Sequence, residues 1–170
     1  MRTLETAALV LEPLTAAHAE AMFEILRDPE LYRFLDDSPP TAVEPLRERY
    51  ARLESRASAD GTQRWLNWVV RKPGEPPLGY VQATVLGDGR AWIAYLIGSR
   101  HWGHGFATQA TTAMLEHLAS DYGVERQLAI VEAENRRSIH LLERLGFRPM
   151  SADEAAGHEP SATERLFVRP

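Results

Sequence analysis

The sequence predicts a mixed α/β domain in which a mostly antiparallel sheet holds one central parallel strand pair and carries helices on both faces. Helical and strand-like segments alternate along the 170 residues, three strand-like segments between residues 64 and 97 are joined by short turns, and a strand, helix, strand unit spans 91–131. Short turns make neighbouring strands antiparallel, whereas a helical crossover makes its two strands parallel. No repeat or linker divides the chain, so residues 1–170 are expected to form one domain.

The first part of the chain is expected to hold one strand and two helices. Residues 9–14 are expected to form a strand, and Thr15 is placed to cap a helix that Asp28-Pro29 ends. A capping box, opened by Thr41 and closed by Glu44, begins the second helix. Both helices have apolar residues along one face, so each is expected to pack against the sheet.

The rest of the chain supplies most of the sheet. Strands are expected at 65–70, 78–86, 91–97, 127–131 and 163–168, because these runs are rich in β-branched, aromatic and apolar residues. A long helix should follow residue 105 and stop at Gly123, and a short one should run over 138–145 and stop at Gly146. Residues 151–160 are polar and contain glycine and proline, which is typical of a loop.

Composition excludes several classes of function. The chain has no cysteine, so it has neither thiolate metal sites nor a cysteine nucleophile. Its formal net charge of -5 gives no attraction for nucleic acid, whose phosphates favour clustered lysine and arginine. The N-terminus lacks a signal-peptide pattern and no apolar run approaches the ~20 residues of a membrane helix. The protein is therefore expected to be cytoplasmic, without a nucleic-acid or membrane partner.

The stretch RHWGHGFATQA, residues 100–110, joins an expected strand to an expected helix. Gly103 and Gly105 let backbone approach a ligand closely, and the first amides of the helix have no partner within it. These amides and the helix dipole attract anions, and Arg100 adds a fixed positive charge. The stretch is therefore interpreted as a backbone cradle for an anion at the carboxyl end of a strand.

Three other interpretations of this stretch are weaker. A metal site on His101 and His104 lacks a third ligand nearby, and the glycines oppose a helix there, so no metal is expected. A P-loop needs Lys and Ser or Thr after its last glycine, where this chain has Phe106. A dinucleotide fingerprint would match two glycines, with Glu132 as the ribose-binding acid, but Thr108 replaces the third glycine. A dinucleotide-binding protein remains a minority alternative.

Arg100-x-x-Gly103-x-Gly105, placed between a strand and a helix, resembles the acetyl-CoA pyrophosphate loop of the GNAT superfamily of N-acetyltransferases. Residues 129–147, with Asn135-x-x-Ser138, are similar to that family's fifth strand and the helix after it. Asp28-Pro-Glu30, Trp102-Gly103 and Asn135-x-x-Ser138 are most similar to the Rim-type branch, which acetylates N-terminal amines of ribosomal proteins. The order of elements fits the family over nearly the whole chain.

The resemblance implies an enzyme that transfers an acetyl group from acetyl-CoA, its co-substrate, to a primary amine by direct attack on the thioester. It implies that backbone amides from residue 101 to 107 hold the pyrophosphate, and that the strand ending at Leu96-Ile97 pairs with pantetheine and offers an N–H to the oxyanion. The expected cofactor-binding residues are Leu96, Ile97, Arg100, His101, Trp102, Gly103, His104, Gly105, Phe106, Ala107, Thr108, Asn135 and Ser138.

The family's usual acid and base are both missing. Leu142 occupies the position of the tyrosine that many members use to protonate sulfur, and Ser138 is the expected substitute, although it could also simply cap its helix. Trp92 occupies the position of the usual glutamate base, and Glu132, or else Glu134, is the candidate that remains. Without a strong base, the acceptor is expected to be an α-amine, with a pKa of about 7.7 to 8.0, rather than a lysine side chain near 10.4.

The acceptor, a peptide N-terminus or a small amine, is expected between residues 31–37 and the 151–160 loop, above Gln63, Trp65 and Asn67. Dimers are common in the family, so a homodimer is compatible with the sequence. The absence of the usual acid and base also leaves a second function open, an acyl-CoA-binding module without turnover.

Overall fold

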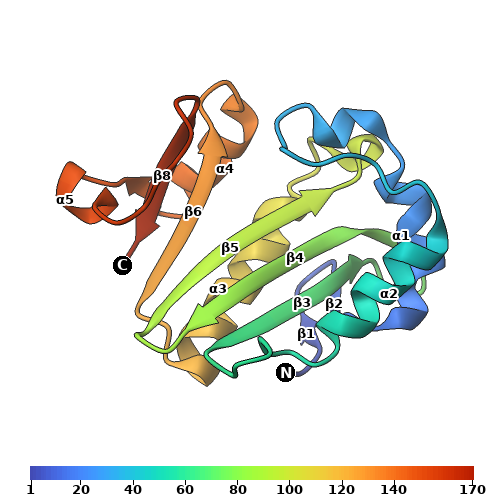
Figure 1. The fold of residues 1–170 in the computed structure, drawn as a ribbon. Coiled ribbons are helices and arrows are strands. Elements are labelled where there is room, and N and C mark those ends of the chain that lie inside the picture. The colour runs from blue at the N-terminus through green and yellow to red at the C-terminus, as the bar shows by residue number, and fades with distance from the viewer.

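The computed structural model describes all residues 1–170, and its eight strands form one sheet in the order β1-β2-β3-β4-β5-β6-β8-β7 (Figure 1). All neighbouring strands are antiparallel except β5 and β6, which are parallel, as the crossover through a helix predicts. The strands are β1 (Leu4–Glu5), β2 (Val10–Pro13), β3 (Gln63–Arg71), β4 (Pro77–Leu86), β5 (Arg90–Ile97), β6 (Arg126–Glu132), β7 (Arg148–Pro149) and β8 (Glu164–Arg169).

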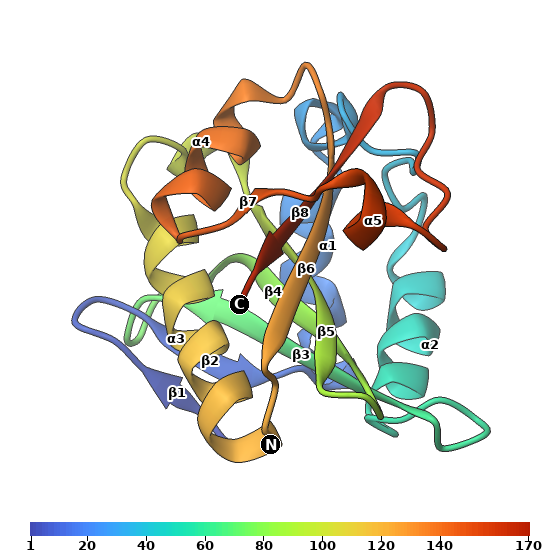
Figure 2. The ribbon, with the colours of Figure 1, turned by 90° about the vertical axis from the view of Figure 1, so that its left-hand side faces the viewer.

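Helices cover both faces of this sheet, so the predicted fold class is confirmed. In Figure 2, α3 and α4 lie on one side of the strands and α1 and α2 on the other. The helices are α1 (Ala19–Leu26), α2 (Val43–Leu53), α3 (Phe106–Tyr122), α4 (Arg136–Arg144) and α5 (Ala152–Ala155), with 3-10 turns at Ala16–His18, Pro29–Tyr32 and Ser99–His101. None of the helices is long and apolar enough to cross a bilayer.

Three short elements were not expected from the sequence. β1 and β7 have two residues each, too few to show any alternation of apolar and polar side chains, and α5 is one turn inside the expected 151–160 loop. One cap was also expected wrongly. The cap position of α2 is Ala42, and no side chain caps this helix, so the capping box expected from Thr41 does not form.

Each face of the sheet has its own apolar core. Alternate residues of β3, β4 and β5 pack with α3 and α4 in the larger cluster, where Met114, Leu118 and Leu142 are almost fully buried. The intervening residues, among them Val69 and Leu96, pack with α1 and α2 in the smaller one. Because side chains alternate between faces along a strand, successive residues of β5 serve the two different sides of the sheet.

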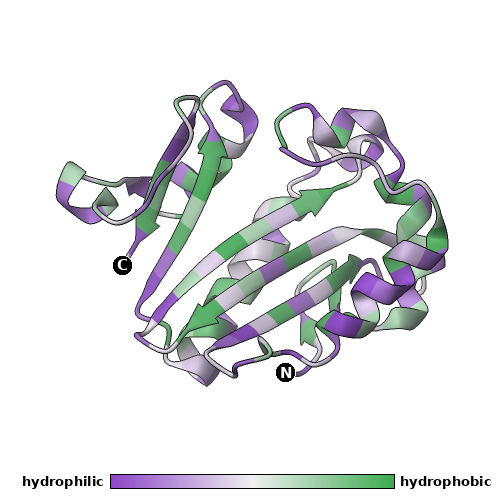
Figure 3. Ribbon diagram, viewed as in Figure 1, coloured by the Kyte–Doolittle hydropathy of each residue, from purple (hydrophilic) through white to green (hydrophobic).

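β5 and β6 separate soon after they begin. Their parallel pairing covers only the first three residues of each strand, and Figure 1 shows them diverging toward their carboxyl ends. The diverging halves are hydrophobic (Figure 3). On its other side β5 is held closely by β4. A Cβ added to Gly79 would lie 2.0 Å from the carbonyl oxygen of Leu96, so only glycine permits this approach of the strands.

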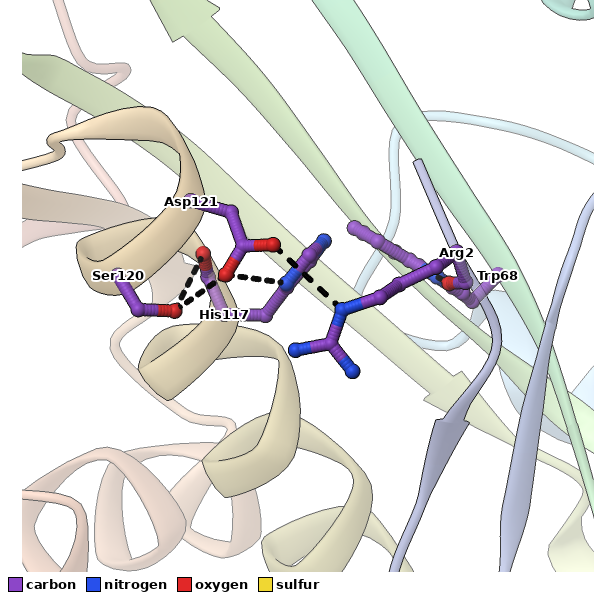
Figure 4. A network of polar contacts seen from close by, with 5 residues as sticks. All are labelled: Arg2, Trp68, His117, Ser120 and Asp121. Carbon is purple, nitrogen blue, oxygen red and sulfur yellow. Dashed lines mark hydrogen bonds and ion pairs between the residues drawn. The ribbon is translucent and has the colours of Figure 1, made fainter.

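A polar network ties the N-terminus to the end of α3 (Figure 4). The Arg2 guanidinium lies 3.5 Å from the carboxylate of Asp121, and the Arg2 carbonyl accepts a hydrogen bond of 2.9 Å from the indole of Trp68. His117 is buried between these groups, with Nδ1 3.2 Å from Asp121 and its ring edge-on to Trp68. Burial lowers the pKa of His117, Arg2 and the N-terminal ammonium act in the same direction, and Asp121 opposes them.

We predict that this histidine makes the free energy of unfolding depend on pH. Below about pH 6.5 the unfolded chain binds a proton that the folded chain resists, so stability should fall as the pH drops from about 6.5 toward the lowered pKa of His117. In urea unfolding between pH 7.5 and 5, His117→Leu should lose less stability than the unsubstituted protein. The exposed His140 on α4 provides the control, because His140→Leu should keep the original slope. Equal slopes for all three proteins would contradict the prediction.

Candidate functional site

A cleft of about 440 Å³ opens where β5 and β6 diverge. Its walls come from these two strands, the start of α4, and the segment after α1 that contains Leu31 and Phe34. Asp28 fixes that segment, because it accepts one hydrogen bond from the Glu30 amide, at 3.0 Å, and another from the hydroxyl of Ser99, in the 3-10 turn after β5. The cleft has the size of a small-molecule site and lies at the carboxyl ends of the parallel pair.

A row of free backbone amides borders this cleft. None of the N–H groups of residues 103–108 donates a hydrogen bond to any protein group. Gly103 and Gly105 have φ angles of +82° and +77°, which side chains other than glycine rarely adopt, and a Cβ on either would meet no atom within 4 Å. These six amides, without a partner in the protein and at the N-terminus of a 17-residue helix, have the geometry of a cradle that can bind an anion.

The structure places the cradle slightly later in the chain than the sequence suggested. The amides of His101 and Trp102 donate to the carbonyls of Gly98 and Ser99, at 2.9 and 3.1 Å, so neither is free for a ligand. Arg100 is exposed and forms no ion pair. The imidazole of His104 stacks on Phe106, with ring centroids 5.5 Å apart, which makes it part of the loop's packing.

Lys72 lies beside the cradle although sequence reasoning assigned it no role. It belongs to the turn between β3 and β4, and its ammonium lies 5.6 Å from the ring centroid of Phe106. Nothing in the local sequence links this turn to the loop at 100–110. Only the pairing of β4 with β5 brings this turn and the loop together. The ammonium of Lys72 thereby adds a second positive charge to that of Arg100.

Trp102 connects the two sides of the cleft. Its indole N–H donates a hydrogen bond of 2.7 Å to the carbonyl of Ile97, the last residue of β5. The guanidinium of Arg137, on the first turn of α4, lies 3.9 Å from the centroid of the indole ring. This cation–π contact spans the distance between the loop after β5 and the helix after β6.

Ser138 meets an unexpected partner. Its Oγ lies 2.7 Å from the hydroxyl of Tyr95 on β5, and both residues line the cleft. Burial raises the pKa of Tyr95 to about 12, so its hydroxyl stays protonated near neutral pH. Asn135, rather than Ser138, caps α4, because its side-chain oxygen accepts a hydrogen bond from the Ser138 amide at 3.1 Å. The Ser138 side chain is therefore not used as a cap.

The positions of the family's usual acid and base hold side chains that cannot transfer a proton, and one of them, Leu142, lines the cleft. Leu142 is 1% exposed and belongs to the core. The ring of Trp92 makes an edge-on contact with His158, with centroids 5.1 Å apart, so the loop at 151–160 reaches β5 at this residue. Glu132 and Glu134 line the cleft, and Glu132 accepts a hydrogen bond of 3.2 Å from the Thr163 hydroxyl. Its catalytic role stays a prediction.

Some of the residues expected around the acceptor line one cavity, and others do not. Leu35 and Asp37, from the segment 31–37, and Asn67 of β3 line a second cavity on the face that α1 and α2 cover. Trp65 instead donates a hydrogen bond to Gln63, and neither lines a cavity described here. Farther along the chain, the Arg148 guanidinium lowers the pKa of the Glu154 carboxyl to about 2.

These features fit acetyl-CoA. Free amides suit its phosphates, the unpaired edge of β5 suits the amides of pantetheine, and the cleft has room for both. Comparison with known families agrees, because the model described as "Acetyltransferase (GNAT) domain" matches residues 8–148. The chain belongs to the GNAT acetyltransferase family. It is thus an N-acetyltransferase by family, and acetyl-CoA is the family's acetyl donor.

Relatives of this GNAT protein include bacterial acetyltransferases. The uncharacterized N-acetyltransferase p20 of Bacillus licheniformis is 29% identical over 150 residues, which cover 87% of this chain and 83% of p20. RimL, a ribosomal L7/L12 alpha-N-protein acetyltransferase solved with coenzyme A, superposes with a TM-score of 0.81 at 17% identity, over 98% of this chain and 97% of RimL. RimJ of Mycobacterium smegmatis gives a TM-score of 0.79 at 24% identity, over 98% of this chain and 85% of RimJ.

We predict that Gly103→Glu weakens the binding of coenzyme A by about 10-fold or more. The new side chain would place a negative charge and bulk beside the amides that we expect to bind phosphate. It would also sit in a backbone conformation that favours glycine. Calorimetric titration with coenzyme A measures the effect. Gly103→Ala carries the same backbone strain without the charge, so it should weaken binding less. An unchanged dissociation constant for Gly103→Glu would remove the cradle from the site.

Proposed function

We propose that this protein transfers the acetyl group of acetyl-CoA to an α-amine, the N-terminus of a peptide or a small amine with a similarly low pKa. The row of unpartnered amides at 103–108 beside the open edge of β5 is the observation that carries the acetyl-CoA part. The proposed cofactor-binding residues are those of the cradle and of the 96–97 strand end, together with Arg100, Asn135 and Ser138. Lys72 and Arg137 add positive charge around the same ligand.

When bound, acetyl-CoA supplies the acetyl group as a thioester, and transfer forms a carbon–nitrogen bond to the amine while the carbon–sulfur bond breaks. The proton that the amine loses balances the proton that the thiol gains. In this proposal the Tyr95 hydroxyl donates to Ser138 Oγ, which leaves the Ser138 hydroxyl hydrogen free to point at sulfur and stabilise its negative charge. Ser138 is thus the catalytic residue, and Tyr95 positions it.

The choice of an α-amine rests on Trp92 and Leu142, whose side chains supply neither a base nor an acid at the positions that the family uses. An amine must be neutral to attack a thioester. At neutral pH an α-amine is neutral about three hundred times more often than a lysine side chain, because their pKa values are about 7.9 and 10.4. Glu132, acting through water, is the group we assign to removal of the last proton.

We predict that Ser138→Ala lowers kcat by about 10²-fold and that Tyr95→Phe lowers it by about 10-fold, the cost of one lost hydrogen bond. The KM for acetyl-CoA should stay within about twofold in Tyr95→Phe, since Tyr95 is not among the proposed cofactor-binding residues, whereas Ser138→Ala can also raise it. Steady-state kinetics with thiol detection separates kcat from KM. Tyr122→Phe, on α3 and outside the cleft, is the matched control and should behave like the unsubstituted enzyme. A Tyr95→Phe variant with full kcat would show that Tyr95 does not position Ser138.

The acceptor class is tested with a peptide panel. One peptide carries a free N-terminus and no lysine, and its partner carries a blocked N-terminus and one lysine. We expect thiol release with the first peptide to exceed the second by about 100-fold or more in kcat/KM at pH 7. The rate with the first peptide should rise with pH and level off about one unit above the pKa of the α-amine, at pH ~9. Acetylation of lysine without acetylation of N-termini would refute the proposed acceptor.

The same panel separates the two other functions. An acyl-CoA-binding module would bind coenzyme A tightly and release no thiol with any amine. A dinucleotide-binding protein would be stabilised against thermal unfolding by a nicotinamide dinucleotide and not by coenzyme A.

A further inference from the structure

A second cavity, of about 50 Å³, lies next to the cleft on the face of the sheet that α1 and α2 cover. Its walls are apolar and include Leu14, Leu26, Leu46 and Leu53. Its floor is polar and includes Asn67 and Gln82. Leu35 and Leu96 line both this cavity and the cleft, so the two spaces meet at Leu96. A ligand whose amine reaches the cleft can therefore extend past Leu96 into the second cavity.

The register of the strands places a polar row across the floor. Asn67 on β3 faces Gln82 on β4, and Gln82 faces Ala94 on β5. The preceding row on the same face consists of Val69, Tyr80 and Leu96, all part of the apolar core under α1 and α2 or packed against it. Two carboxamides thus lie side by side, and the small Ala94 leaves space between them and the cleft.

Neither carboxamide has a partner in the protein. The residue Asn67 is 8% exposed, and neither its side chain nor that of Gln82 donates or accepts a hydrogen bond within the protein. The polar atoms of both side chains keep contact with solvent in the cavity, because neither is among the buried atoms without a partner. Both carboxamides are therefore free to bind a ligand that supplies a donor and an acceptor.

The walls indicate what else this ligand carries. Four leucines from the end of β2, from α1 and from α2 enclose the space above the carboxamides. Burial raises the pKa of both Tyr50 and Tyr80, so their hydroxyls are neutral, and the two charged residues at the rim, Asp37 and Arg49, lie 3.9 Å from each other. A water molecule needs at least about 10 to 15 Å³ of cavity volume. A cavity of about 50 Å³ therefore accepts about three to five heavy atoms.

We propose that the second cavity binds the apolar side chain of the acceptor, while Asn67 and Gln82 bind the amide group that follows its amine. The substrate class is therefore a peptide or amino-acid amide whose first residue has a branched or linear aliphatic side chain of about leucine size. This inference rests on the proposed function, since it takes the amine to be the group that is acetylated. It adds the selection of the first side chain, which the cleft alone does not provide.

Amino-acid amides test this selection, because their amines are all of the α type. We expect kcat/KM for leucinamide to exceed that for glycinamide by about 10- to 200-fold, and tryptophanamide, which is too large for the cavity, to be poor. Asn67→Leu keeps the size of the side chain and removes the carboxamide, so it should raise the KM for leucinamide about 10-fold and change kcat little.

Leu53→Trp fills the cavity from α2 and should abolish the preference for leucinamide over glycinamide. Its neighbour Arg52 is exposed, so Arg52→Trp adds the same indole on the outside of the same helix and should keep the preference. The binding of coenzyme A and the thermal midpoint show whether each variant is folded. A preference that Leu53→Trp leaves unchanged would overturn the assignment of this cavity.

Calorimetric titration of the coenzyme A complex with leucinamide and glycinamide separates this inference from the proposed function. Acetylation of all amides at similar kcat/KM would overturn the cavity assignment and leave acetyl transfer intact. Tighter binding of leucinamide that Leu53→Trp abolishes, without acetylation of any amine, would support the cavity and refute the proposed reaction. Failure of leucinamide to bind better than glycinamide, together with no selective acetylation, would overturn the inference.

Discussion

The parallel pairing of β5 with β6 ends after three residue pairs, although both strands continue for several residues. Inside a sheet, backbone groups without a neighbouring strand lose hydrogen bonds that water or a ligand must replace. The amides of 103–108, which begin just past the end of β5, also have no partner in the protein and need water or a ligand in the same way. A ligand that carries phosphates at one end and amides along its length can satisfy both sets of groups, and this requirement links the fold to coenzyme A.

The contacts that cross the opening show why the two strands can separate without the sheet falling apart. Arg137 reaches Trp102 near the cradle, and Ser138 reaches Tyr95 deeper in the cleft, so neighbouring residues of α4 contact both the loop and the strand. The polar cap at Asn135 fixes the start of α4 and hence the place of both side chains. Side-chain contacts thus replace backbone pairing at the points where the sheet is open.

Local sequence was enough for the order of the long elements, the parallel pair and the place of the glycine loop before α3. These depend on the periodicity of apolar residues, on the helical crossover between β5 and β6, and on the backbone freedom of Gly103 and Gly105. Local sequence was not enough for contacts made by distant segments. Tyr95 looks like an ordinary strand residue until α4 brings Ser138 beside it, and Lys72 looks like a turn residue until β4 carries that turn to the cradle. The capping box predicted at Thr41 was wrong for another reason. The motif is present, but α2 begins at Val43, so Ala42 and not Thr41 occupies the cap position.

The face of the sheet under α1 and α2 explains why a base can be absent. Along β5 this face carries Trp92, Ala94 and Leu96, and a carboxylate among them would lie between an aromatic contact and an apolar core, where ionisation is costly. The same face carries the carboxamides of Asn67 on β3 and Gln82 on β4, beside which we propose that the acceptor lies. An acceptor whose amine is already partly neutral needs no buried charge on β5, so the proposed preference for an α-amine and the lack of a carboxylate on β5 have one physical origin.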